Sequence, residues 1–337
     1  MFGDVGSIEG NEDMRMPRLK ISGRSAVYHC IARVVGGQFL LQDEEKEKLR
    51  LLLWEYAEFC GVEIVTYCVM SNHFHVLVRV PEEVVLSDVE LVEKARRFYG
   101  KKSPLVQSMQ KHFEKHGQVP DDLRESLMGR MADVSTFMKE VKQRFSKWYN
   151  KQTNRFGTMW AERFKSVLVE DTVDTVSTVA MYVDLNPVRA GLVKDPKDYR
   201  FCGYAEAVAG NQLARAGIIG FHQADDWRKV AIAYRKALIV VSATANHSDK
   251  VPVDREAIQA ELDRGAELSR GQVLRLRVRY MTDGMVLGSK NYVNGIFAEY
   301  RDRFGPKRKT GARKLREVGD SLGLLTSARD LRKSVVS

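Results

Sequence analysis

The stretch from Met70 to Val78, Met-Ser-Asn-His-Phe-His-Val-Leu-Val, constrains this chain more than any other segment. Two histidines flank one large apolar residue, and an unbroken apolar run follows them. Because successive side chains of a strand point to opposite faces, His73 and His75 share one face of the predicted strand, and Phe74 takes the other. Two imidazoles on one face can chelate a divalent ion. The alternative is that both pack on a polar sheet face and bind nothing.

The surrounding segments alternate between strand and helix patterns. Turn residues, alternating apolar residues and helix-capping signals predict these elements in order. They are a strand over 26–35, a helix over 43–60, a strand over 62–70, a strand over 73–80, a helix over 135–151, a strand over 158–169 and a helix from 171 or 172 that stops at Pro187. Only Ser71-Asn72 separates the second and third strands, which predicts a tight hairpin. This order predicts an α+β fold, with a ferredoxin-like antiparallel sheet and helices on one face.

Composition divides the chain into three parts. Residues 1–20 are expected to form a flexible leader, and residues 21–208 a domain with a helical insertion at 82–135. Residues 209–337 are expected to form a basic, mainly helical C-terminal extension, in which 254–267 and 289–304 have helical patterns and 269–280 fits helix or strand.

The positive charge is concentrated near the C-terminus. The 337 residues have a net charge of +10, and residues 206–337 hold 24 Lys and Arg against 15 Asp and Glu. Such an excess predicts a polyanionic partner, with nucleic acid as the first candidate. A solvated basic surface is the alternative interpretation.

Cysteine spacing and hydropathy bear on the compartment. The four cysteines lie far apart without a CxxC pair, which is typical of buried thiols in a reducing cytoplasm. No apolar run reaches the roughly 18 residues of a membrane span, and the acidic N-terminus lacks the apolar core of a signal peptide. We therefore expect a cytoplasmic protein that does not enter a membrane.

A second group of chemically useful residues lies far downstream. Tyr182 and Asn186 are four residues apart, so they share a face of the predicted helix. If that face packs on the histidine face of the sheet, Asn186 can supply an oxygen to an ion, and Tyr182 can act as a nucleophile. Spacing alone does not choose the nucleophile, and the rival tyrosines are Tyr28, Tyr67 and Tyr149.

Several motifs occur in an order that resembles one family. His-Phe-His follows Met-Ser-Asn, and the run from Tyr182 to Gly191 reads Tyr-Val-Asp-Leu-Asn-Pro-Val-Arg-Ala-Gly. The segments 148–164 and 199–204 also match, although Cys-Gly stands where the family often has Ser-Ser. Over residues 22–208 the chain resembles the REP-associated tyrosine transposases, members of the single-tyrosine His-hydrophobic-His superfamily. The segments 283–289 and 304–308 resemble the extension of larger members.

This resemblance implies a chemistry for the named residues. His73 and His75 would bind Mg²⁺ or Mn²⁺, with Asn186 as the third ligand. Tyr182 would attack a phosphate of single-stranded DNA, leaving a 5′-phosphotyrosine and a free 3′-OH. The implied function is a metal-dependent tyrosine transposase, an endonuclease and strand transferase that cleaves and rejoins DNA at hairpin-forming repeats. A non-catalytic hairpin-binding regulator and a nuclease that uses water are the alternatives, and monomer and homodimer stay open.

Basic and aromatic residues are candidates for holding the DNA, because single strands bind in basic grooves with aromatic platforms. The alternative for the aromatic residues of the 135–151 helix is that they form its core face. The candidates are Lys142, Lys147, Trp148, Arg163, Lys307, Arg308, Lys309, Arg313 and Lys314.

Overall fold

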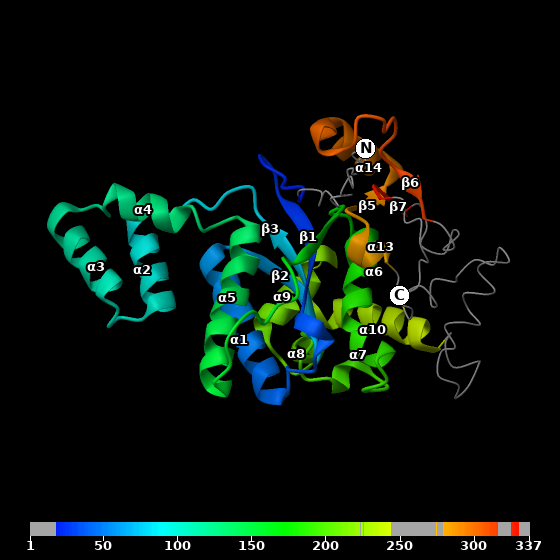
Figure 1. The fold of residues 1–337 in the computed structure, drawn as a ribbon, viewed down its shortest axis with the longest axis horizontal. Coiled ribbons are helices and arrows are strands. Elements are labelled where there is room, and N and C mark those ends of the chain that lie inside the picture. Colours follow the sequence, from blue (N-terminus) through cyan, green and yellow to red (C-terminus); the bar gives the residue numbers. More distant parts are fainter. Residues whose placement is uncertain are drawn as a thin grey trace, which may run out of the picture.

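One sheet forms the centre of the chain (Figure 1). The structure is a computed structural model that describes residues 18–222, 224, 226–243, 274, 279–315 and 325–329. The first elements are β1 (Ala26–Arg33), α1 (Asp43–Cys60), β2 (Glu63–Val69), β3 (His73–Val80), α5 (Val134–Thr153) and β4 (Lys165–Val169). The strand order β2-β3-β1-β4, with every pair antiparallel, is the ferredoxin-like arrangement. The predicted α+β class is confirmed.

Helices α1 and α5 lie on the sheet face opposite the histidines. Trp54 of α1 meets Tyr67 at 6.0 Å between ring centroids, and the Phe74 ring lies 5.6 Å from Trp160. Phe145 of α5 lies 5.8 Å from the same Trp160 ring. These aromatic contacts place the two helices together on one face, as predicted. The later helix α6 (Val173–Asp184) lies on the histidine face instead.

Local signals set the helix ends. The side chains of Gln42 and Glu45 form a capping box at the start of α1, so Asp43 is the first helical residue. The Thr172 hydroxyl caps α6 by accepting from the backbone N–H of Thr175. Pro187 does not end α6, which stops at Asp184. It lies instead in the first turn of α7 (Asn186–Arg189), where a proline is tolerated.

The segment predicted as a helical insertion is helical and projects from the sheet domain (Figure 1, cyan to green). It contains α2 (Asp88–Tyr99), α3 (Pro104–His116) and α4 (Asp121–Met128). The apolar side chains that the segment 82–135 buries are Leu91, Ala95, Val106, Met109, Val119, Leu127, Met131 and Val134.

The C-terminal part contributes strands as well as helices. Its helices are α8 (Gly203–Val208), α9 (Gln212–His222), α10 (Trp227–Ala243), α13 (Tyr280–Asp283) and α14 (Lys290–Glu299). The short strands β5 (Val286–Ser289), β6 (Arg313–Lys314) and β7 (Leu325–Ser327) extend the sheet to the order β2-β3-β1-β4-β5-β7-β6. The sequence predicted a mainly helical extension and none of these three strands. Residues 1–17 of the predicted leader over 1–20, and the predicted helix over 254–267, lie outside the described residues.

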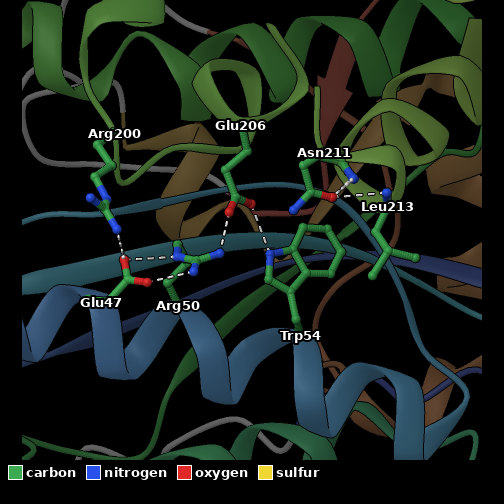
Figure 2. A network of polar contacts seen from close by, with 8 residues as sticks. Glu47, Arg50, Trp54, Arg200, Glu206, Asn211 and Leu213 are labelled. Atoms are coloured by element: carbon green, nitrogen blue, oxygen red, sulfur yellow. Dashed lines mark hydrogen bonds and ion pairs between the residues drawn. The ribbon is translucent and has the colours of Figure 1, made fainter. Parts of the chain in front are cut away.

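A polar network ties α1 to the C-terminal helices (Figure 2). Arg50 bonds both Glu47 and Glu206 of α8, and the indole of Trp54 donates to Glu206 at 2.9 Å. Arg200 reaches Glu47 at 3.1 Å. The side chains of Arg50 and Glu206 are only 15% and 11% exposed, so solvent screens this pair less than a surface pair. The network fixes α8 against α1 beside the β2 edge.

The four cysteines are free and buried, as expected. Among the described residues, no helix combines the length and the apolar character that a membrane span requires.

Candidate active site

The histidine pair lies at the start of β3, an interior strand of the sheet. In the β1–β3 register His73 faces Arg33 and His75 faces Ile31, so all four share one sheet face. His73 is 9% exposed and His75 is 2% exposed. Strand β1 places a third imidazole, His29, on the same face, and it is fully buried.

His29 determines which nitrogen of His75 carries a proton. The Nδ1 atom of His29 lies 2.7 Å from the carbonyl oxygen of Met281, and its Nε2 lies 2.9 Å from Nδ1 of His75. A carbonyl only accepts, so Nδ1 of His29 donates to it. Burial lowers the pKa of His29 to about 4, so the ring is neutral near pH 7 and its Nε2 accepts from His75. His75 is therefore protonated on Nδ1, and its Nε2 carries the lone pair.

An amide fixes His73 in the same tautomer. Nδ1 of His73 lies 2.6 Å from Oδ1 of Asn72, and Nδ2 of Asn72 donates to the carbonyl of Gly37 at 3.2 Å. Because the amide oxygen accepts, His73 also donates from Nδ1 and keeps its lone pair on Nε2. Both histidines thus present the same nitrogen as a possible metal ligand, each oriented by a second group.

Tyr182 lies against these imidazoles. Its ring meets His75 at 6.0 Å and His29 at 5.9 Å, edge to face in both cases. The guanidinium of Arg189 lies 4.0 Å from the centre of the same ring. Tyr182 is fully buried, and its hydroxyl has no hydrogen-bond partner among the described residues. Helix α6 therefore brings the predicted nucleophile to the histidine face.

Asn186 follows one turn after Tyr182 and is 8% exposed. Its Nδ2 donates to the backbone carbonyls of Tyr182 and Val183, at 3.4 and 3.1 Å. That orientation turns Oδ1 away from those carbonyls, as a metal-ligating amide would require. Two imidazoles and one amide oxygen fit a divalent ion chemically. In the described part of the chain, no cluster of three or more His, Cys, Asp or Glu side chains could hold a metal.

The rival tyrosines belong to other surroundings. In the strand registers Tyr28 and Tyr67 fall on the face opposite the histidines, and Tyr149 packs in α5 against Phe145. The Tyr28 hydroxyl accepts from the backbone N–H of Ile21 at 2.8 Å. The Tyr182 ring, in contrast, contacts both His29 and His75.

A buried carboxyl anchors α6 between Tyr182 and Asn186. Asp184 is fully buried and accepts hydrogen bonds from Thr66 of β2 and Tyr234 of α10, both at 2.7 Å. The backbone N–H of Tyr204 donates to it at 3.4 Å. Burial raises the pKa of Asp184 to about 7, and these donors oppose the rise. Sequence reasoning missed Asp184, His29 and Arg189, because their roles depend on partners far away in the chain.

The predicted DNA-binding residues differ in their exposure to solvent. Lys142 is buried, donates to the carbonyl of Glu162 at 2.8 Å, and has its pKa lowered by burial to about 8. This position favours a structural role. Trp148 is partly buried against the core. Lys147, Arg163, Lys307, Lys309 and Lys314 are exposed, and Arg308 and Arg313 are partly exposed.

The chain is similar to known proteins in one family comparison and one structural comparison. Residues 23–118 match the model of the family described as Transposase IS200 like. The matched segment covers less than a third of the chain. The match contains β1, the hairpin and both histidines, and it supports a transposase role for the chain. No curated protein matches. A solved structure of a REP-associated tyrosine transposase bound to a REP hairpin is similar, with 16% identity over 58% of this chain and 86% of that chain, at a TM-score of 0.37.

Proposed function

We propose that this chain is a metal-dependent tyrosine transposase that cleaves and rejoins single-stranded DNA at hairpin-forming repeats. The observation that carries the proposal is the contact between the Tyr182 ring and His75, on the face that also holds His73. The tyrosine of α6 and the two imidazoles of β3 are distant in sequence and lie on one sheet face, and Asn186 follows Tyr182 by one helical turn.

Each residue of the site has a separate role in a phosphoryl transfer. The Tyr182 oxygen attacks phosphorus and forms a phosphotyrosine at the 5′ side, while the bond from phosphorus to the 3′ oxygen breaks. The phenol proton leaves to solvent, and the departing 3′ oxygen takes up a proton as a free hydroxyl. A divalent ion held by His73, His75 and Asn186 would supply positive charge at the scissile phosphate. Arg189 adds a fixed positive charge beside the tyrosine ring.

Because Tyr182 is buried, the groups that cover it must move before a substrate can enter. The neighbours of Tyr182 are tied to the C-terminal part, because Arg189 donates to the carbonyl of Leu274 at 2.7 Å and His29 to that of Met281. A fully buried hydroxyl cannot reach a DNA phosphate until such groups separate.

A covalent-trapping assay tests the proposal. The protein is incubated with Mn²⁺ and labelled hairpin DNA that carries single-stranded flanks, and the products are separated on denaturing gels. We expect a covalent protein–DNA band that disappears in Tyr182→Phe and in His73→Ala. Tyr149→Phe is the matched control, since it removes a buried tyrosine hydroxyl away from the histidines, and should retain the band.

The other outcomes identify the other functions. Cleavage without a covalent band, unchanged in Tyr182→Phe, would indicate a nuclease that uses water. Binding without cleavage or adduct, across a library of hairpins, would indicate a hairpin-binding regulator.

A further inference from the structure

Two loops meet beside the His73 end of the sheet. The first, residues 34–42, joins β1 to α1, and the second, residues 154–164, joins α5 to β4. The backbone N–H of Val35 donates to the carbonyl of Met159, and that of Ala161 to the carbonyl of Arg33, both at 2.9 Å. The loops are thus held together along the last residues of β1.

The first loop is also fixed to the turn that precedes His73. The backbone N–H of Val34 donates to Asn72, and that of Leu41 to Ser71, both at 2.9 Å. Asn72 bonds both Gly37 of this loop and Nδ1 of His73. Only one amide side chain therefore separates the loop backbone from the candidate metal ligand.

Each loop carries a phenylalanine whose side chain is exposed to solvent. Phe39 in the first loop is 70% exposed, and Phe156 in the second is 88% exposed. Exposing an aromatic ring forfeits the burial that normally stabilises it. Every other phenylalanine of the described residues is buried or partly buried. Two such rings on adjoining loops beside the site indicate a partner with flat apolar faces.

Arg33 adds a positive group at the base of the two loops. It is the cross-strand neighbour of His73 and lies on the same face, which places their Cβ atoms about 5 Å apart. Its Nε is buried without a hydrogen-bond partner among the described residues. A guanidinium with an unused donor is suited to a phosphate, which accepts two parallel hydrogen bonds.

We infer that this surface, made of Arg33, Phe39 and Phe156, binds the unpaired nucleotides that flank the scissile phosphate. The two rings stack on bases, and Arg33 bonds the backbone between them and the Tyr182 site. Aromatic rings beside cations are the pattern by which proteins hold single strands. The second loop adds Arg155 and the exposed Arg163, so the surface is complementary to a polyanion. The inference rests on the proposed function for the identity of its ligand.

Binding of plain oligonucleotides tests the surface apart from catalysis. Fluorescence anisotropy compares oligo(dT) of about 20 nucleotides with an abasic strand of equal length. In the Tyr182→Phe background, we expect Phe39→Ala and Phe156→Ala each to weaken oligo(dT) binding about tenfold and to leave abasic binding unchanged. Arg33→Gln should weaken both strands, because both retain phosphates. Leu213→Ala, a change at an apolar side chain that is 58% exposed on α9, is the matched control and should change neither.

The outcomes separate this inference from the proposed function. Equal oligo(dT) affinity of wild type and both phenylalanine variants overturns the stacking surface, even if Tyr182 forms its covalent adduct. An equal loss on the abasic strand also overturns it, because no base is then involved. Selective loss on oligo(dT) supports the surface even if no adduct forms. Arg33→Gln is checked by circular dichroism, and Arg33→Lys provides a second variant that keeps the charge but loses the paired donors.

Discussion

Nε2 of His29 lies 2.9 Å from Nδ1 of His75, inside a sheet where both imidazoles are almost fully buried. The two residues are 46 positions apart in the sequence, and strand pairing alone brings them together. This bond makes His29 a positioning residue for the candidate metal ligand.

Replacing His29 by alanine is expected to weaken metal binding without abolishing it. Loss of an orienting partner behind a metal-bound histidine typically costs about 10- to 100-fold in affinity. Isothermal titration with Mn²⁺ measures the change directly and needs no DNA. His112→Ala on helix α3 is the control, because that imidazole lies in the insertion. Unchanged Mn²⁺ affinity in His29→Ala would show that His75 does not depend on this bond.

The hydrogen bonds to Asp184 should contribute to stability jointly. Thr66→Val and Tyr234→Phe each remove one donor to a buried carboxyl, so each should lower the free energy of unfolding by about 1–3 kcal/mol. We expect the loss of unfolding free energy in the double variant to differ from the sum of the two single losses, since both donors bond the same carboxyl. Urea denaturation measures all three, with Tyr149→Phe as a control remote from Asp184. Strictly additive losses would contradict the shared role.

The buried amine of Lys142 predicts a stability change at alkaline pH. Its pKa is about 8 in the folded chain against an ordinary value of 10.5, so the unfolded chain binds more protons between these values. The free energy of unfolding should therefore gain a rising contribution from about pH 8 to 10.5, and none below that window. Lys142→Met lacks the titrating group and should lose this contribution. Denaturation curves of wild type and Lys142→Met, measured across this pH window, give the two unfolding free energies. If both depend on pH in the same way, the prediction is wrong.

Exposed lysines near the C-terminus should control salt-dependent DNA binding. Neutralising Lys307 and Lys309 to glutamine is expected to weaken hairpin binding and to flatten its salt dependence, by about 0.7–0.9 in slope for each DNA phosphate that is no longer neutralised. Arg308 is different, because its guanidinium lies over Phe297 and Phe304 and donates to Thr310 and Gly311.

The comparison variants sharpen that test. Arg308→Gln should lower stability as well as binding, whereas the two lysine variants should affect binding alone. The Lys101→Gln, Lys102→Gln pair, exposed in the insertion, is the charge-matched control. An unchanged salt slope in the Lys307 and Lys309 variant would remove this region from the DNA-binding surface.

Local patterns predicted the ferredoxin-like core well. Strand β3 has the predicted bounds, and α1 ends at Cys60 as its apolar spacing and Gly61 indicate. Contacts between distant segments were beyond such reasoning. His29 is one polar residue in an apolar strand, and only the β1–β3 register, which pairs it with Leu77, shows that it lies on the same face as His75. The strands β5, β6 and β7 are too short for a periodic pattern, since they have four, two and three residues.

The roles of single basic residues were also hidden in the sequence. Lys142 and Lys147 look equivalent on a helical projection of charge, yet one amine is buried against Trp160 and the other is exposed. Burial depends on the loop after α5, which folds back over the helix. The Pro187 prediction failed for a related reason, because a proline can begin a helical turn as well as end one.

The parallel pairing of β5 with β4 has a consequence for truncated forms of this chain. With β5 in place, β4 is an interior strand, and Leu168 and Glu170 donate backbone hydrogen bonds to Met285 and Leu287. Removing everything after α10 would leave these amides open along an apolar edge, which is a template for pairing with another copy. The C-terminal strands thus cover the β4 edge and prevent self-association through it, in addition to any contact that they make with DNA.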